Sequence, residues 1–191
     1  SELAREAGIV ATTASGHLKR LLEGGLLAVE KQGRHRYYRL AGPEVADAIE
    51  ALMDLAEQSN QRRVRPGPKD PELRRARVCY DHLAGQRGVE LFARLTRLKL
   101  IALDDGAVAI TPRGERHFGA FGIDIAALKA AKRPVCRTCL DWSERRVHLA
   151  GGLGAELLDR FFSLRWAHRV EGSRIVRFTP TGERAFPRLF E

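Results

Sequence analysis

The sequence contains no apolar run that approaches the roughly 18 uncharged residues of a membrane-spanning helix. Nothing near its start resembles a secretory signal peptide. It has no glycine-rich nucleotide loop, and no pair of carboxylates in a recognisable catalytic setting. These absences argue against a membrane protein, a secreted protein and a nucleotide-dependent enzyme, and they favour a cytoplasmic location.

The chain does carry a large excess of positive charge. It has 33 Lys and Arg against 24 Asp and Glu, which gives a formal net charge of +9 and a pI near 10.1. Such a balance favours a polyanionic partner, because neutralising phosphates releases counterions, although it does not separate DNA from RNA or an acidic membrane. The length of 191 residues and the hydrophobic content of 44% predict more than one domain with a proper core.

The first 25 residues predict two short helices separated by a glycine turn. Leu3, Ala4 and Ala7 form an apolar face before Gly8, and Gly24 and Gly25 end the second helix. The spacing of the apolar residues in the second helix predicts a buried face of Ala14, Leu18, Leu21 and Leu22. The other faces are small, hydrogen-bonding or cationic, as base edges and phosphates in a DNA major groove require: Thr12, Thr13, Ser15, Gly16, His17, Lys19 and Arg20.

Two β-prone runs follow, over 26–40, and they predict a hairpin with a basic tip. The tip carries Arg34, His35 and Arg36, which would lie along the DNA backbone or in the minor groove. The plain alternative is an amphipathic helix pair with a solvated, charged hairpin.

Three motifs carry a family resemblance: Ser15-x-His17-Leu18, Gly25-Leu26-Leu27 and Gly33-Arg34-x-x-Tyr37-Tyr38-x-Leu40. In this order and spacing, residues 1–57 resemble the winged helix-turn-helix of the ArsR/SmtB family of bacterial repressors. The resemblance implies a homodimer that binds double-stranded operator DNA and releases it on sensing a metal, an oxidant or another signal. It also implies two further helices before the first one, so we expect the natural chain to start earlier.

The stretch from Pro43 to Glu57 predicts another helix, with an apolar stripe and only acidic charges. The acids would repel DNA, so the helix should supply a dimer seam or a packing face, which is its role in the resembled family. The stripe consists of Val45, Ile49, Leu52, Met53 and Ala56. This helix has no histidine and residues 2–6 have no cysteine, so the family's usual metal sites are not expected here.

A basic, proline-rich segment at 58–71 predicts an extended or mobile linker. Beyond it, 72–191 contains an internal repeat. His82-Leu83-Ala84-Gly85-x-x-Gly88-x-Glu90-Leu91 recurs from His148 to Leu157, and Thr111-Pro112-x-Gly114-Glu115-Arg116-x-Phe118 recurs from Thr179 to Phe186. The copies span about 72–131 and 140–191.

Each copy is expected to run helix, glycine turn, helix, hairpin and helix, with hairpin turns at 104–106 and 171–173. The predicted fold class is α+β, mainly α: a winged helix-turn-helix domain followed by two degenerate winged-helix-like repeats. Two related copies should pair about an approximate two-fold axis, and their seam is a candidate ligand pocket.

The segment between the copies is the best candidate for a sensor. Cys136 and Cys139 could form a reversible disulfide, since nearby cations lower thiol pKa values, or bind a soft metal together with Cys79, His82 or His148. Inert or structural cysteines remain an alternative, because structural zinc sites usually have two Cys-x-x-Cys pairs or an added histidine pair. No metal or cofactor is assigned from the sequence.

His82 and His148 occupy equivalent places in the two copies, so they could face one another as a ligand or pH-sensitive pair; alternatively each fills a polar niche. Trp142 and Arg145 are further ligand candidates. The sequence thus predicts a homodimeric, non-enzymatic transcriptional repressor with a metal or small-molecule effector. The competing hypotheses are a thiol oxidoreductase using Cys136 and Cys139, which lacks the expected βαβ context, and an RNA-binding module.

Overall fold

The structure is a computed structural model that describes residues 2–32, 35–58, 68, 70–104, 107–141 and 143–190. Its Cα positions divide the chain into two compact units, Ser1–Arg62 and Arg63–Glu191. The described residues combine helices with short antiparallel hairpins, in agreement with the predicted α+β class. None of the helices among them has the length and apolar character that crossing a bilayer requires.

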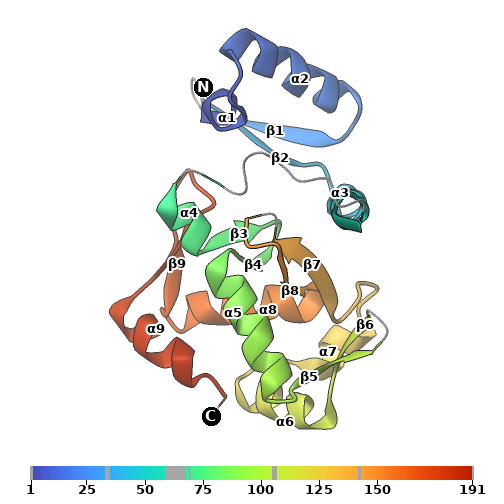
Figure 1. The fold of residues 1–191 in the computed structure, drawn as a ribbon, viewed down its shortest axis with the longest axis vertical. Coiled ribbons are helices and arrows are strands. Elements are labelled where there is room, and N and C mark those ends of the chain that lie inside the picture. The colour runs from blue at the N-terminus through green and yellow to red at the C-terminus, as the bar shows by residue number, and fades with distance from the viewer. Residues whose placement is uncertain are drawn as a thin grey trace. The chain divides into compact units, whose positions relative to one another are not determined.

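The first unit consists of two helices, a hairpin and a third helix (Figure 1). In chain order these are α1 (Glu2–Ala7), α2 (Ala11–Glu23), β1 (Leu27–Gln32), β2 (His35–Leu40) and α3 (Pro43–Gln58). Helix α2 ends at the predicted glycines: the Gly24 amide donates to the Arg20 carbonyl, and Gly25 takes a positive φ of 69° that favours glycine. Both α1 and α2 therefore form where the sequence predicted them.

The core of the first unit is built on small side chains. Ala4 of α1, Ala14 of α2 and Ala46 of α3 are buried, whereas Leu18 and Leu22 are half-buried. Leu21, predicted on the buried face, is 38% exposed. The prediction was wrong there because the described part of the first unit packs only one side of α2, along the row of Ala14, Leu18 and Leu22.

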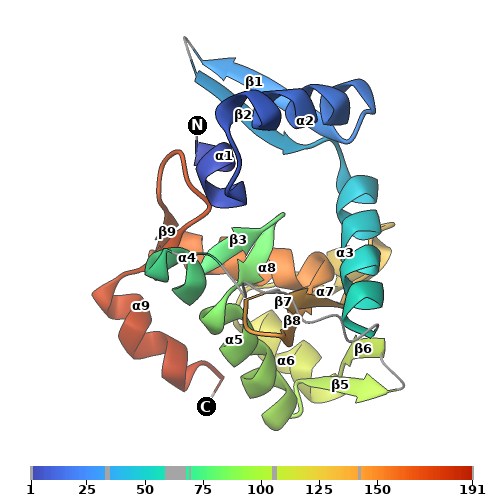
Figure 2. The same ribbon diagram turned by 45° about the horizontal axis from the view of Figure 1, so that its top comes forward.

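Strands β1 and β2 lie side by side as a hairpin (Figure 2). Leu27 pairs with Leu40 at its base, and Gln32 pairs with His35 near its tip. The tip residues Gly33 and Arg34 lie outside the described residues. Most of the predicted linker is also outside them, but its two ends are helical. Gln58 is the last residue of α3, and Asp70 accepts a hydrogen bond from the Glu72 amide to cap the next helix.

The second unit contains one order of elements twice: hairpin, helix, hairpin, helix. After α4 (Pro71–Arg75), the first half consists of β3 (Arg77–Cys79), β4 (His82–Ala84), α5 (Gln86–Arg97), β5 (Ile101–Asp104), β6 (Ala107–Ile110), α6 (Pro112–Ala120) and α7 (Ile125–Ala130). The second half consists of β7 (Arg137–Asp141), β8 (Arg146–Ala150), α8 (Gly151–Ser163), β9 (Ala167–Arg169), β10 (Val176–Phe178), α9 (Pro180–Ala185) and the 3-10 turn Phe186–Arg188.

The start of each half differs from the prediction, which placed a helix before the glycine turn. A hairpin stands there instead, β3–β4 in the first half and β7–β8 in the second. In the first half the strands are only three residues long and almost wholly buried, so they show no alternation that sequence could reveal. Their backbone is paired further by a distant segment, since the Val78 amide donates to the Arg174 carbonyl. Strand β7 also begins before residue 140, the expected start of the second copy.

The two halves share one core, because each long helix packs on the hairpin of the other half: α5 lies against β8 and α8 against β4, while β4 also contacts β8 (Figure 1). Two helix glycines also let each long helix lie against the strand that precedes it in its own half. A Cβ on Gly88 would lie 2.4 Å from the Leu83 carbonyl oxygen, and one on Gly154 would lie 2.6 Å from that of Leu149. Phe118, Phe161 and Phe186 fill the interior below these hairpins.

Candidate functional sites

One face of α2 is polar and open to solvent. Every residue that the sequence assigned to DNA contact on this helix is exposed: Thr12, Thr13, Ser15, Gly16, His17, Lys19 and Arg20. The buried side of the same helix is held by Ala14, with Leu18 and Leu22 beside it. The helix therefore presents short donors, acceptors and cations on a surface anchored from behind.

The polar face has few competing internal contacts. Ser15 donates its hydroxyl to the Ala11 carbonyl at 2.9 Å, which leaves the oxygen able to accept. Lys19 forms an i,i+4 ion pair with Glu23 at 3.7 Å, and both side chains are well exposed. An exposed pair of this kind contributes little free energy, so it competes weakly with a phosphate for the lysine.

The structure describes two of the three hairpin residues that were predicted to contact DNA. Arg36 is exposed on β2, and His35 begins that strand opposite Gln32. Arg34 lies outside the described residues. The acidic helix α3 exposes three apolar residues, with Ile49 39%, Leu52 65% and Leu55 62% exposed. Three exposed aliphatic side chains are a large apolar surface for one helix of a small unit.

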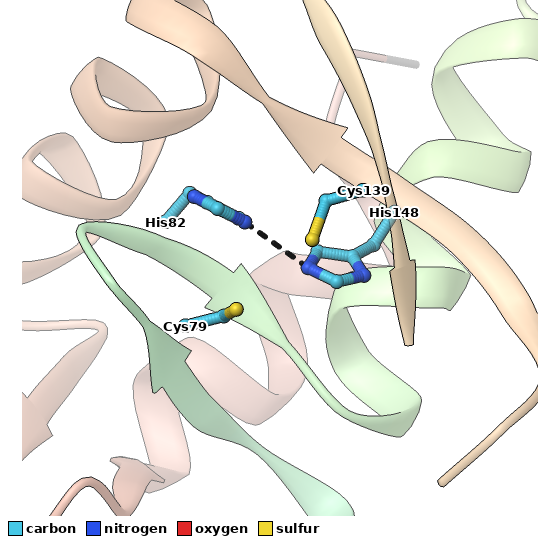
Figure 3. A group of neighbouring side chains, drawn as sticks. All are labelled: Cys79, His82, Cys139 and His148. Atoms are coloured by element: carbon cyan, nitrogen blue, oxygen red, sulfur yellow. Dashed lines mark hydrogen bonds between the residues drawn. The ribbon is translucent and has the colours of Figure 1, made fainter. Parts of the chain in front are cut away.

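A second site lies inside the second unit, where four metal-ligating side chains converge (Figure 3). Cys79, His82, Cys139 and His148 each offer one ligand atom, and these atoms all lie within 4.8 Å of one another. The Nε2 atoms of the two histidines are 3.1 Å apart, so the pair predicted from the repeat does face one another. Cys139 and both histidines are buried, and Cys79 is half-buried.

The two hairpins supply these residues in the same way. Cys79 lies directly opposite His82 in β3–β4, and Cys139 lies directly opposite His148 in β7–β8. Side chains of directly paired residues stand on the same face of a hairpin, so each hairpin presents one thiol and one imidazole together. Contact between β4 and β8 then brings the two pairs to one point.

Acidic residues lie behind both imidazoles. His82 donates from Nδ1 to the Asp81 carboxylate at 3.2 Å, and Arg133 also binds that carboxylate. Burial raises the pKa of Asp81, but the bonds from His82 and Arg133 outweigh it and bring the pKa to about 2. Asp81 is therefore ionised and accepts the Nδ1 proton of His82, so Nε2 is the ring nitrogen of His82 that faces the cluster.

His148 is arranged differently. Its Nδ1 is buried without a hydrogen-bond partner among the described residues, and the Asp141 carboxylate lies 4.0 Å from it. Burial lowers the pKa of His148, despite the interaction with Cys79, which raises it. The imidazole is therefore neutral near pH 7. Its Nε2 shares a hydrogen bond with Nε2 of His82.

Asp141 also ties the two halves together. Arg77 donates to both of its carboxylate oxygens at 2.8 Å, and the Gly85 amide donates at 2.7 Å. Burial raises the pKa of Asp141, but hydrogen bonds from Ser143 and the charge of Arg77 lower it to about 2. This buried pair joins β3 to β7 beside the cluster.

The thiols differ in character. Interaction with the Cys139 thiol holds the pKa of Cys79 well below its usual value, with help from His148 and His82 and against the effect of burial. Cys136 is not in the cluster, and burial raises its pKa to about 12. Cys139 lies within β7, whereas Cys136 comes just before that strand begins at Arg137. The second thiol at the site is thus Cys79, not Cys136.

Of the two further ligand candidates, Arg145 and Trp142, the structure describes only Arg145. Arg145 lies half-buried in the turn between β7 and β8, with a positive φ of 53°, and its amide donates to the Asp141 carbonyl. Trp142 lies outside the described residues. Asp81, Asp141 and Arg77 were not predicted as site residues, although a pattern in the sequence points to them. Arg-x-Cys-x-Asp occurs at 77–81 and again at 137–141, before histidines that follow at different distances.

Comparison with known proteins identifies the class. The chain is 40% identical over 185 residues to an uncharacterised HTH-type transcriptional regulator, YdfF of Bacillus subtilis, and the match covers 97% of this chain and 82% of that protein. A second match, to the HTH-type transcriptional regulator Rv0324 of Mycobacterium tuberculosis, is 36% identical over 56 residues, or 29% of this chain and 25% of that protein.

No model of a known protein family matches the chain, and no solved structure matches it. The two relatives are both regulators with a helix-turn-helix, a non-enzymatic class. The chain belongs to the family of HTH-type transcriptional regulators that includes YdfF. The prediction of a non-enzymatic function is confirmed, and the thiol oxidoreductase hypothesis is set aside.

Proposed function

We propose that this protein is a winged helix-turn-helix repressor of the ArsR/SmtB type, which binds double-stranded operator DNA as a homodimer. The exposed polar face of α2 carries the proposal. Its short hydrogen-bonding side chains suit base edges in the major groove, and Lys19 and Arg20 suit phosphates. The exposed Arg36 on the hairpin would add contacts to the DNA backbone or minor groove, and so would Arg34 and His35, which precede it in the sequence.

Dimerisation is proposed to use α3. Ile49, Leu52 and Leu55 are exposed on this helix, and all of its charged residues are acidic. A second copy of the chain is therefore a better partner for this face than DNA. Two recognition helices about one helical turn apart would read a pseudo-palindromic site. The second unit, proposed to be a duplication of degenerate winged-helix modules, would sense the signal, and the protein would act in the cytoplasm.

The experiment is a direct DNA titration over a range of salt concentrations. Arg36→Ala should weaken binding to all sequences and reduce the slope of log K against log salt by about 1 per lost contact. Ser15→Ala or His17→Ala should instead change sequence preference, by roughly 1–3 kcal/mol at the affected base pair. Arg116→Ala, an exposed arginine on α6, is the matched control and should change neither.

Equal effects of Arg36→Ala and Arg116→Ala on the salt slope would contradict the role of the hairpin. Tighter binding to structured RNA than to duplex DNA at equal salt would contradict the proposal that the protein binds operator DNA.

A further inference from the structure

We propose that Cys79, His82, Cys139 and His148 bind one divalent cation of the zinc class, which joins the two halves of the second unit. This site is independent of the DNA-binding proposal, since all four residues belong to hairpins far along the chain from α2. Two ligands come from each half, so the cation would crosslink β3–β4 to β7–β8 (Figure 3).

The geometry is close to what a tetrahedral ion needs. Zn–S bonds of about 2.3 Å and Zn–N bonds of about 2.0–2.1 Å place tetrahedral ligand atoms roughly 3.3–3.8 Å apart. The four ligand atoms are within 4.8 Å of one another, and the two Nε2 atoms are already 3.1 Å apart. Small side-chain movements therefore complete the site, with no rearrangement of the strands.

The donor set selects the kind of ion. Two thiolates and two imidazoles suit a borderline-soft ion such as Zn²⁺, whereas Mg²⁺ and Ca²⁺ require oxygen ligands. With four protein ligands the coordination shell is full, so no position is left for a reactive water. The site is thus a structural or sensing site, in keeping with a non-enzymatic protein.

The surroundings support the imidazoles in the manner of metal sites. Asp81 already accepts the Nδ1 proton of His82, as carboxylates commonly do behind metal-bound histidines. When a cation binds Nε2 of a neutral His148, the ring proton is on Nδ1, which faces the Asp141 carboxylate 4.0 Å away. The buried Nδ1, which has no hydrogen-bond partner among the described residues, would then carry a proton on the side of the ring that faces a carboxylate. The thiol protons that remain are released to solvent on binding.

Close packing of the helices keeps the ligands in place. The Cβ of His148 is 3.5 Å from where a Cβ on Gly88 would lie, and the Cβ of His82 is 3.2 Å from the same position on Gly154. Each histidine is therefore held between its own hairpin and the helix of the other half. Such support reduces the conformational entropy that the side chains lose when a cation binds.

The test is a Co²⁺ titration of the full chain, with its thiols reduced and its metal removed. We expect one Co²⁺ per chain, with the intense visible bands of tetrahedral cobalt and sulfur-to-cobalt charge-transfer absorption, and both should vanish when Zn²⁺ displaces Co²⁺. Zn²⁺ should also raise the melting temperature of the chain, because it binds only the folded state.

Variants assign the ligands. Cys139→Ser should weaken Co²⁺ binding by more than about 100-fold, and Asp81→Asn, which retains all four ligands, by about 10–100-fold. Cys136→Ser is the matched control and should leave both the spectrum and the affinity unchanged, because Cys136 is outside the cluster. Melting curves of the metal-free variants verify that each one folds.

Several outcomes would overturn the proposal. These are a Co²⁺ spectrum without charge-transfer bands, equal losses in Cys136→Ser and Cys139→Ser, or no binding by the reduced chain. A reduced chain that ignores Co²⁺ but links Cys79 to Cys139 on mild oxidation would indicate a redox pair instead. The titration contains no DNA, so its failure leaves the DNA-binding proposal untouched.

Discussion

At the scale of single residues, the second unit depends on a few buried charges that have specific partners. Arg77 and Asp141 are both fully buried, and they form a bidentate pair between the two halves. A buried ion pair need not add stability compared with apolar residues, but removal of one partner leaves an uncompensated charge in a low dielectric. The main role of Arg77 is thus to compensate the buried charge of Asp141, and the net stabilisation from the ion pair itself is secondary.

Arg77→Ala should therefore destabilise the second unit by about 3–5 kcal/mol, towards the lower value because Gly85 and Ser143 still donate to Asp141. Denaturant unfolding followed by tryptophan fluorescence measures this, since both tryptophans belong to the second unit. Arg177→Ala removes an exposed ion pair with Glu72 and should leave the unfolding midpoint in place. Similar midpoints for the two variants would contradict the importance given to the buried pair.

At the scale of elements, the second unit is held together by helices that pack on the opposite hairpin. The glycines Gly88 and Gly154 allow α5 and α8 to lie in close contact with the backbone of the preceding strand of their own half, β4 and β8 respectively. The same glycines face the histidines of the other half, since a Cβ on Gly88 would lie 3.5 Å from the Cβ of His148 and one on Gly154 would lie 3.2 Å from the Cβ of His82. Helix packing and the geometry of the thiol and histidine cluster are therefore coupled.

Gly154→Ala should lower the stability of the second unit by about 1–3 kcal/mol, because the added Cβ would lie 2.6 Å from the Leu149 carbonyl oxygen. Gly119→Ala, in α6 of the same unit, has no atom within 4 Å of its added Cβ and should be neutral or stabilising by up to about 1 kcal/mol. The same fluorescence-detected unfolding compares them. If Gly154→Ala were as benign as Gly119→Ala, the helices would not be as closely packed as described.

At the scale of the whole molecule, the exposed apolar residues of α3 determine the expected assembly. A face with Leu52 and Leu55 more than half exposed is unfavourable in a monomer, and its acids turn it away from DNA. Pairing of this face with a second copy would bury the leucines and double the DNA-contacting surface.

Leu52→Glu combined with Leu55→Glu should weaken self-association by about tenfold or more, since each buried leucine contributes roughly 1.5–3 kcal/mol. Sedimentation equilibrium measures the change, and the affinity for a palindromic operator should fall with it. Leu103→Glu, at a leucine 45% exposed on β5, is the matched control and should leave the dimer intact. A double variant that remains dimeric would place the interface elsewhere.

Local patterns in the sequence were sufficient for the first unit. The glycines at 24 and 25, the spacing around Ala14 and the β-prone runs are short-range features, and backbone propensity and periodicity act over the same range. The exposed face of α2 followed from that periodicity alone. Leu21 on α2 and Leu3 on α1, which is 50% exposed, departed from the predicted pattern, because burial depends on which neighbours cover a face and not on spacing alone.

The sequence also revealed the recurring motifs of the second unit and the correspondence of His82 with His148, because identical residues in register need no structure to be recognised. It did not reveal β3 and β4, whose three-residue strands exist through pairing with each other and with residues near 175. Nor did it place Cys79 beside Cys139 in preference to Cys136. That choice required the tertiary structure, since only contact between two hairpins of different halves decides which side chains share one buried point.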